Sequence, residues 1–251
     1  MKYYIIPNKD DLDKYIKLAN KYNLGFEYND FYDPEFLDNG NVDNLINIYK
    51  SLNRKDDTMH GVFYDIVLDS TDPKIAKISY DRVKSSLDIA AKLNLKGVVF
   101  HTNYITWMKN DWYRKNWVKK NKDIYLKLIE EYQNLEIYIE NMFDLDPYEL
   151  RNLMDEINHE RIGVCLDVAH ASISNIDINI WFDVLGKYIK HIHINDNDLK
   201  VDSHDEIGKG LIDYKKVFNL INKLDDKTSI LIEIKDYDKT VNSLKYLNII
   251  K

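Results

Sequence analysis

The chain has 251 residues, 45% of them hydrophobic, and this length and composition predict one domain, residues 1–251, with a sizeable buried core. Its formal net charge of -7 disfavours a nucleic-acid partner, because binding to phosphate draws on clustered Lys and Arg. The single cysteine, Cys165, excludes an intrachain disulfide, and neither a signal peptide nor a stretch of membrane-spanning length is found. We therefore expect a cytoplasmic protein with no membrane partner.

Short apolar runs alternate with longer amphipathic segments, which is the pattern of repeated βα units with a parallel sheet. The predicted strands are Tyr3–Ile6, Gly25–Tyr28, Thr58–Phe63, Gly97–His101, Glu136–Glu140, Gly163–Asp167, Ile189–Ile194 and Ile230–Ile234. The predicted helices are Asp10–Tyr22, Val42–Leu52, Pro73–Leu93, Trp112–Tyr132, Pro147–Ile157, Ile178–Tyr188, Tyr214–Leu224 and Val241–Ile249. Because an open sheet of this size would leave edges to protect, the pattern predicts an α/β fold closed into a (β/α)8 TIM barrel.

Carboxylates and histidines stand at or just beyond the ends of the predicted strands, and active sites of barrels lie where strands end. These residues are His60, His101, Glu140, Asp167, His170, His193, Asp202, His204 and Glu233. Within this set, Glu140, Asp167, His193 and Glu233 supply the three carboxylates and one imidazole of a hard ligand set suited to Mn²⁺, Co²⁺, Mg²⁺ or Zn²⁺. Carboxylates gathered in a buried site repel one another without a cation, so the pattern predicts a divalent metal ion.

Three features close in sequence to the predicted ligands have less specific interpretations. His170 is expected to bind a second metal or to donate a hydrogen bond to substrate. His191 is expected to face away from His193, toward the surrounding helices, and to be structural. The polar run Asn195–Asp198 taken alone is typical of solvated turns, although its place directly after His193 gives it more weight as a source of ligands.

Four residues are predicted to contact substrate, and each has an alternative interpretation. The loop 102–121 carries Trp107, Trp112 and Trp117; the first two are predicted to stack on a sugar ring, and the alternative is a helix start packed on the barrel. Glu27, near the end of the second strand, contacts substrate or forms a buried ion pair. Lys209, between two glycines, meets a phosphate or lies in a solvated turn.

In this order the motifs resemble the xylose-isomerase-like TIM-barrel superfamily, which holds sugar isomerases and epimerases, an uncharacterised sugar phosphate isomerase/epimerase branch, and endonuclease IV type apurinic endonucleases. The motifs are Met59-His60-Gly61, Val99-Phe100-His101, Ile139-Glu140-Asn141, Cys165-Leu166-Asp167-Val168-Ala169-His170, His193-Ile194-Asn195-Asp196, Asp202-Ser203-His204 and Ile232-Glu233. Two departures concern substrate contacts. Ser203 stands where the endonucleases commonly have arginine, and Leu199 lies where the epimerases usually have a substrate-binding arginine.

The resemblance implies different metal counts for the two reactions. In the ketose epimerases, residues matching Glu140, Asp167, His193 and Glu233 bind one divalent ion, and the two glutamates act as acid and base. In the endonucleases, residues matching all nine positions hold three zinc ions, and this chain has a ligand-type residue at each position. We therefore expect one ion, with ligands present for up to three.

The leading hypothesis is a metal-dependent isomerase or epimerase of a sugar or sugar phosphate. In it Glu140 or Glu233 removes a proton next to a carbonyl, the other glutamate returns one, and His170 orients substrate hydroxyls. Its partner is a small carbohydrate, and a homodimer is expected. The alternative is a multinuclear zinc phosphoesterase resembling endonuclease IV type apurinic endonucleases. A third hypothesis, a sugar-binding protein without catalysis, is less favoured because both glutamates are present.

Overall fold

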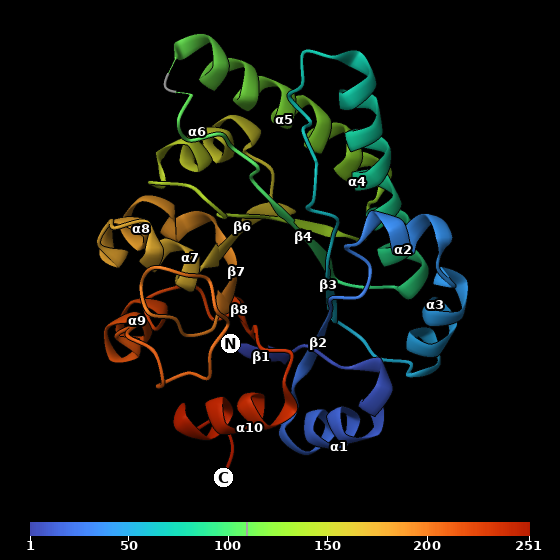
Figure 1. Cartoon of the computed structure of the whole chain (residues 1–251), viewed down its shortest axis with the longest axis vertical. Coiled ribbons are helices and arrows are strands. Elements are labelled where there is room, and N and C mark those ends of the chain that lie inside the picture. The colour runs from blue at the N-terminus through green and yellow to red at the C-terminus, as the bar shows by residue number, and fades with distance from the viewer. Residues whose placement is uncertain (109) are drawn as a thin grey trace. The chain divides into compact units, whose positions relative to one another are not determined.

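The computed structural model describes residues 1–108 and 110–251, in which strands alternate with helices along the chain (Figure 1). The strands of this part are β1 (Lys2–Ile5), β2 (Gly25–Tyr28), β3 (Thr58–His60), β4 (Gly97–His101), β5 (Glu136–Glu140), β6 (Ile162–Asp167), β7 (Ile189–Ile194) and β8 (Ser229–Ile232). They form a closed barrel in chain order. The predicted (β/α)8 TIM barrel is confirmed, whereas the single-domain organisation of residues 1–251 stays a prediction.

The helices follow the strands and include short ones that the sequence did not predict. Those of the described part are α1 (Leu12–Tyr22), α2 (Pro34–Asn39), α3 (Val42–Ser51), α4 (Pro73–Leu93), α5 (Asp111–Glu131), α6 (Tyr148–Ile157), α7 (Val168–Ile173), α8 (Ile178–Leu185), α9 (Tyr214–Ile221) and α10 (Tyr237–Tyr246), with 3-10 turns η1 (Lys9–Asp11) and η2 (Gly186–Tyr188). Among these residues we find no helix that combines the length and the apolar character needed to cross a membrane.

The chain divides into two compact units. One unit comprises Met1–Glu27, Asn141–Pro147 and Val164–Lys251. In it, β8 lies between β1 and β7 and pairs with both in parallel. The N-terminus lies at β1 and the C-terminus just beyond α10 (Figure 1). This unit contains the ends of β6, β7 and β8, and therefore most of the predicted metal ligands.

The other unit comprises Tyr28–Glu140 and Tyr148–Gly163. In it, β4 pairs in parallel with β3 and with β5, and the register sets His101 directly beside Glu140. The interiors of these strands are apolar and buried, from Val98 on β4 to Ile139 on β5. Because the apolar residues occupy the body of each strand, the polar residues that terminate the strands are brought together at one end of the sheet.

Several predicted boundaries are wrong, each for a local reason. Strand β3 stops at His60 rather than Phe63, and the backbone of Gly61 donates a 2.8 Å hydrogen bond to Val99 O as the chain leaves the sheet. The last helix begins at Tyr237 rather than Val241, because the side chain of Asp236 caps it by accepting from Lys239 N at 2.9 Å. The predicted and observed bounds of β2, β4, β5 and β7 agree.

Arg161 connects the end of α5 to the loop that leads into β5, and it carries a prediction about stability. Its guanidinium donates to Ile129 O at 2.7 Å, to Tyr132 O at 2.8 Å and to Leu135 O at 3.1 Å. These bonds satisfy carbonyls that the end of a helix leaves without partners. We expect Arg161→Met to lower the free energy of unfolding by about 2–3 kcal/mol, since hydrogen bonds to a charged donor are lost.

Urea unfolding followed by circular dichroism measures this change. Arg151→Met is the matched control, because Arg151 pairs with Asp155 on the surface of α6 at 2.5 Å and such pairs contribute little. Equal losses in the two variants would contradict a special role for Arg161.

Candidate metal centre

The ends of β3, β4 and β5 bring His60, His101 and Glu140 together, and we call these three residues the first cluster. His60 Nε2 lies 3.1 Å from His101 Nε2 and 3.2 Å from Glu140 Oε2, and His101 Nε2 lies 3.4 Å from the same oxygen. All three residues are buried, with exposed fractions of 3%, 8% and 0%. Two imidazole nitrogens and a carboxylate oxygen therefore face one point from which water is largely excluded.

The orientation of His60 is set by its other ring nitrogen. His60 Nδ1 lies 2.9 Å from Gly61 O, a distance at which the Nδ1–H donates to the carbonyl. In the neutral ring this leaves a lone pair on Nε2, directed at His101 and Glu140. Lone pairs facing one another are repulsive, so the first cluster needs a proton or a metal cation at its centre.

The ends of β6 and β7 and the residue just after β8 bring Asp167, His193 and Glu233 together, and we call these the core cluster. Asp167 and His193 are register partners on neighbouring strands, and His193 Nδ1 lies 3.5 Å from Glu233 Oε2. The exposed fractions of the three residues are 0%, 0% and 6%.

Asn141 holds Asp167 in place and directly follows Glu140 in the chain. Its side chain accepts from Asp167 N at 2.9 Å and donates to Asp167 O at 3.0 Å. Asn141, the residue after Glu140, is thereby hydrogen-bonded to the backbone of Asp167. The sequence analysis assigned Asn141 no role, although a buried amide directly after a strand-end carboxylate was a usable signal.

The third cluster consists of His170 at the start of α7 with Asp202 and His204 from the loop after β7. Asp202 Oδ2 lies 3.2 Å from His170 Nε2 and 3.1 Å from His204 Nε2. Each ring places its other nitrogen on a backbone carbonyl, His170 Nδ1 on Asn141 O and His204 Nδ1 on Glu233 O, both at 2.9 Å. As in the first cluster, the anchored Nδ1–H leaves Nε2 directed at a carboxylate.

The charges of the third cluster are strongly coupled. Burial would lower the pKa of His204, but the carboxylates of Glu233 and Asp202 raise it to about 10. Burial would raise the pKa of Asp202, but His170 and His204 hold it well below its usual range. The cluster therefore favours an anionic carboxylate next to positive charge, and a bound cation would supply that charge in place of the protons.

These three clusters contain all nine predicted ligands, and their chemistry fits divalent metal ions. Imidazole nitrogens and carboxylate oxygens are the ligands of zinc and manganese sites. Metal-binding histidines usually donate their second N–H to a carbonyl or carboxylate, as His60, His170 and His204 do here. The donor sets therefore fit resident cations in each cluster.

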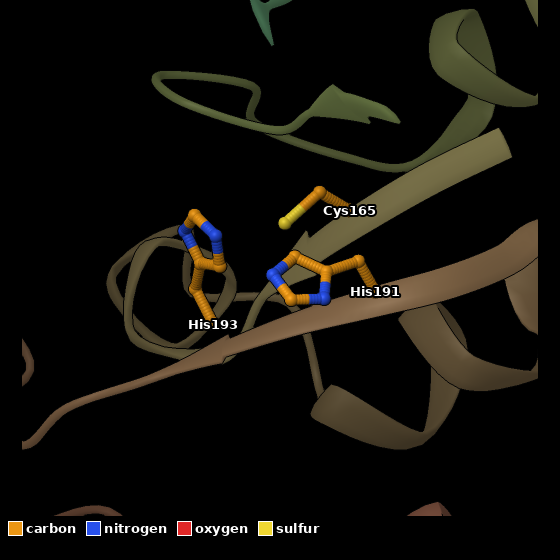
Figure 2. A group of neighbouring side chains, drawn as sticks. All are labelled: Cys165, His191 and His193. Carbon is orange, nitrogen blue, oxygen red and sulfur yellow. The ribbon is translucent and has the colours of Figure 1, made fainter. Parts of the chain in front are cut away.

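The prediction for His191 is wrong. Residues two apart on a strand face the same side, so His191 lies on the same face of β7 as His193 (Figure 2). The two rings are fully buried with centroids 5.1 Å apart. Both contact Glu27, through His191 Nε2 and His193 Nε2, at 3.0 Å each. The side chain of Glu27 is fully buried beside the two rings. Contact of Glu27 with substrate stays a prediction.

The polar run after β7 is not a set of solvated turns. Asn195, Asp196 and Asn197 are fully buried. The carboxylate of Asp196 accepts from Gly208 N at 2.8 Å and from Ile212 N at 3.2 Å, and its backbone pairs with Asp205. Asp196 thus fixes the loop that carries Asp202 and His204, a positioning role that the sequence analysis did not assign.

The other predicted substrate residues lie on the surface, outside the three clusters. Trp107 and Trp112 are 80% and 61% exposed, whereas Trp117 is buried and donates from Nε1 to Thr102 O at 3.2 Å. Lys109, in the same segment, lies outside the described residues. Lys209 is exposed in the turn after Glu206. Contact of Trp107, Trp112 and Lys209 with substrate stays a prediction.

The related sequences include uncharacterised proteins and proteins named probable endonuclease 4. An uncharacterised protein of Methanocaldococcus jannaschii is 32% identical over 195 residues, covering 75% of this chain and 76% of that protein. A probable endonuclease 4 of Mycoplasma mobile is 33% identical over 115 residues, covering 38% of this chain and 41% of that protein.

Solved structures share the fold at lower identity. A Thermus thermophilus protein, solved after soaking with ZnCl2, has a TM-score of 0.80 at 21% identity and covers 99% of this chain and 97% of its own. A D-tagatose 3-epimerase-like protein has a TM-score of 0.79 at 20% identity and covers 99% and 96%. The family model described as xylose isomerase-like TIM barrel matches residues 23–248. The chain therefore belongs to the xylose isomerase-like TIM barrel family.

Proposed function

We propose that this chain is a multinuclear metal-dependent phosphoesterase. The observation that carries the proposal is the presence of three ligand clusters in which His60, His170 and His204 are each anchored through one nitrogen with the other directed at a carboxylate. Isomerisation around one ion requires only the core cluster and Glu140. It gives no function to the buried contact of His60 with His101 or to the contact of Asp202 with His204.

The ions would be held by the first cluster, by the core cluster and by the third cluster. Bound there, divalent cations supply positive charge that polarises a phosphoryl oxygen and lowers the pKa of water. The chain itself supplies carboxylates at the points where a proton must be held. Glu140 and Glu233 stand at the ends of β5 and β8 and are the bases placed to accept a proton from attacking water.

The kinship with proteins named probable endonuclease 4 supports a phosphodiester substrate, and an abasic-site DNA duplex is the first specific candidate. The net charge of -7 counts against extensive contact with DNA, because counterion release by clustered Lys and Arg contributes little, so a small phosphodiester is a candidate beside the duplex. The exposed rings of Trp107 and Trp112 are available for stacking on a base or a sugar.

A second candidate is the metal-dependent sugar isomerase or epimerase with a single ion. It is favoured by the presence of Glu140, Asp167, His193 and Glu233, the four residues that the resemblance implies as ligands of one ion, with the two glutamates as acid and base. The structural likeness to a D-tagatose 3-epimerase-like protein supports the same interpretation at the level of the fold. In this candidate, the proton passes through the two glutamates, and His170 orients the substrate hydroxyls.

Metal content per chain separates the two candidates. We expect elemental mass spectrometry, after re-equilibration with mixed Mn²⁺, Co²⁺, Mg²⁺ and Zn²⁺, to find two or three ions in the wild-type chain. His101→Ala should lose one of them, because it removes a ligand of the first cluster only. Lys209→Ala, outside the clusters, is the control and should keep the full content.

The same preparations are then assayed on bis(4-nitrophenyl) phosphate, on an abasic-site duplex, and on a sugar panel in deuterated water. Cleavage of either phosphodiester, reduced in His101→Ala, supports the proposal. One ion per chain together with deuterium incorporation into a sugar would overturn it and establish the isomerase.

A further inference from the structure

Ser229 on β8, His191 on β7 and Glu27 on β2 form a row of polar contacts that ends at His193 of the core cluster. His191 Nδ1 lies 2.6 Å from Ser229 Oγ, and His191 Nε2 lies 3.0 Å from Glu27 Oε2. Glu27 Oε1 lies 3.0 Å from His193 Nε2. His193 ends the row, since its Nδ1 lies on the side of Glu233. The row therefore leads to a predicted metal ligand.

Hydrogen-bond donors and acceptors can be assigned along this row from Ser229 to His193. Ser229 Oγ lies 2.6 Å from Nδ1 of His191 and 3.4 Å from Lys190 O. With the hydroxyl hydrogen directed at the nearer nitrogen, His191 carries its own hydrogen on Nε2 and donates it to Glu27. The second oxygen of Glu27 lies 3.0 Å from Nε2 of His193, within ion-pair distance. If the neutral ring of His193 carries its hydrogen on Nε2, its lone pair is on Nδ1, the atom that lies 3.5 Å from Glu233 Oε2.

The charge of Glu27 explains why two imidazoles are present rather than one. A fully buried carboxylate is costly unless donors satisfy it, and each of its oxygens contacts one ring. His191 thus has a function beyond packing, since its contact with one oxygen of Glu27 keeps the other oxygen aligned with His193.

A second metal site is the rival explanation for these residues. Cys165, His191 and His193 also offer ligand atoms within 4.8 Å of one another, and Figure 2 shows the sulfur on β6 facing the two rings on β7. Both ring nitrogens of His191, however, and Nε2 of His193 already face Ser229 or Glu27. A metal at this point would displace Glu27 from its donors, so the positioning role fits the contacts better.

We propose that Glu27 is a positioning residue that fixes the ring of His193 with the Nδ1 lone pair directed at the metal ion, and that Ser229 and His191 hold Glu27 in that role. This inference rests on the metal binding in the proposed function and is independent of the reaction catalysed. Partners of this kind usually raise metal affinity 10-fold to 100-fold, roughly, by orienting the ligand and making it more basic.

Cobalt binding tests the role directly. We expect Glu27→Gln to weaken the Co²⁺ affinity of the core cluster by about 10-fold to 100-fold, measured by titration of the cobalt absorption bands. The glutamine keeps the size of the side chain, but its amide group presents N–H to one of the two rings. Cys165→Ala is the control, because it changes packing beside the same rings without touching the row, and it should leave the cobalt affinity unchanged.

Nitrogen-15 NMR of the histidines in the wild-type chain gives a second measurement that does not depend on a folded variant. We expect His193 to carry hydrogen on Nε2 and none on Nδ1, with the same tautomer for His191. Hydrogen on Nδ1 of His193, or equal cobalt affinities in Glu27→Gln and wild type, would overturn the positioning role alone. A wild-type chain that binds no cobalt would overturn both this role and the proposed function.

Discussion

Glutamine at position 140 should lower kcat/KM for phosphodiester cleavage by about 10²-fold to 10⁴-fold, the range usually lost with a general base. Glu140 is fully buried, and its Oε2 is the atom that both His60 and His101 approach in the first cluster. An amide has nearly the same shape but removes the negative charge, so the effect is expected in the chemistry and not in the fold.

Glu149→Gln is the matched control for this variant. Glu149 is also largely buried, but it pairs with Arg114 on the helical face, away from the ligand residues. Steady-state kinetics and metal content are measured for both variants, because loss of an ion from Glu140→Gln must be separated from loss of the base. Wild-type kcat/KM in Glu140→Gln with full metal content would exclude Glu140 from catalysis.

Removal of the metals should lower the thermal stability of the chain substantially. Asp167 and Glu233 are buried carboxylates of the core cluster, and cations that neutralise them would bind the folded chain. A ligand at a thousand times its Kd stabilises by about 4 kcal/mol, and for a chain of this size that corresponds to roughly 8–16 °C in Tm. We therefore expect a shift of this order between chelator-treated protein and protein with added Zn²⁺ or Mn²⁺.

Differential scanning calorimetry measures the shift, and Asp167→Asn supplies the test of its origin. Asparagine can still accept from His170 N as the cap of α7, as the Asp167 carboxylate does at 2.6 Å, but it is a weaker metal ligand. The variant should therefore retain most of the stability of the metal-free chain and lose most of the gain on adding metal. An unchanged gain in Asp167→Asn would place the stabilising ions elsewhere.

The barrel was predictable from the sequence because its strands are short apolar runs that end in polar residues. The bounds of β4 and β5 follow from Gly97–His101 and Glu136–Glu140, in which every interior residue is apolar. The short helix α7 was missed because Val168–Ile173 is too brief to show a helical period. Its capping residue, Asp167, was already predicted to be a metal ligand, and the structure adds the capping hydrogen bond.

The members of the site were also predictable, but their grouping was not. Strand ends identify which residues lie in the candidate site, whereas ring orientation depends on carbonyls far away in the chain, such as Glu233 O for His204. The role of Glu27 was left open because its partners, His191 and His193, lie on a strand that is distant in sequence. The error on His191 was one of strand geometry, since an interval of two keeps a side chain on the same face.

The loop fixed by Asp196 has a kinetic consequence for the metals. The side chains of Asp202 and His204 are 25% and 38% exposed, whereas those of Asp167 and His193 are fully buried. An ion in the third cluster would therefore be bound partly by a solvent-exposed loop. Hydrogen bonds to one carboxylate, Asp196, hold the conformation of that loop. We expect that ion to enter last and to leave first, so that the metals of one chain exchange with solution at unequal rates.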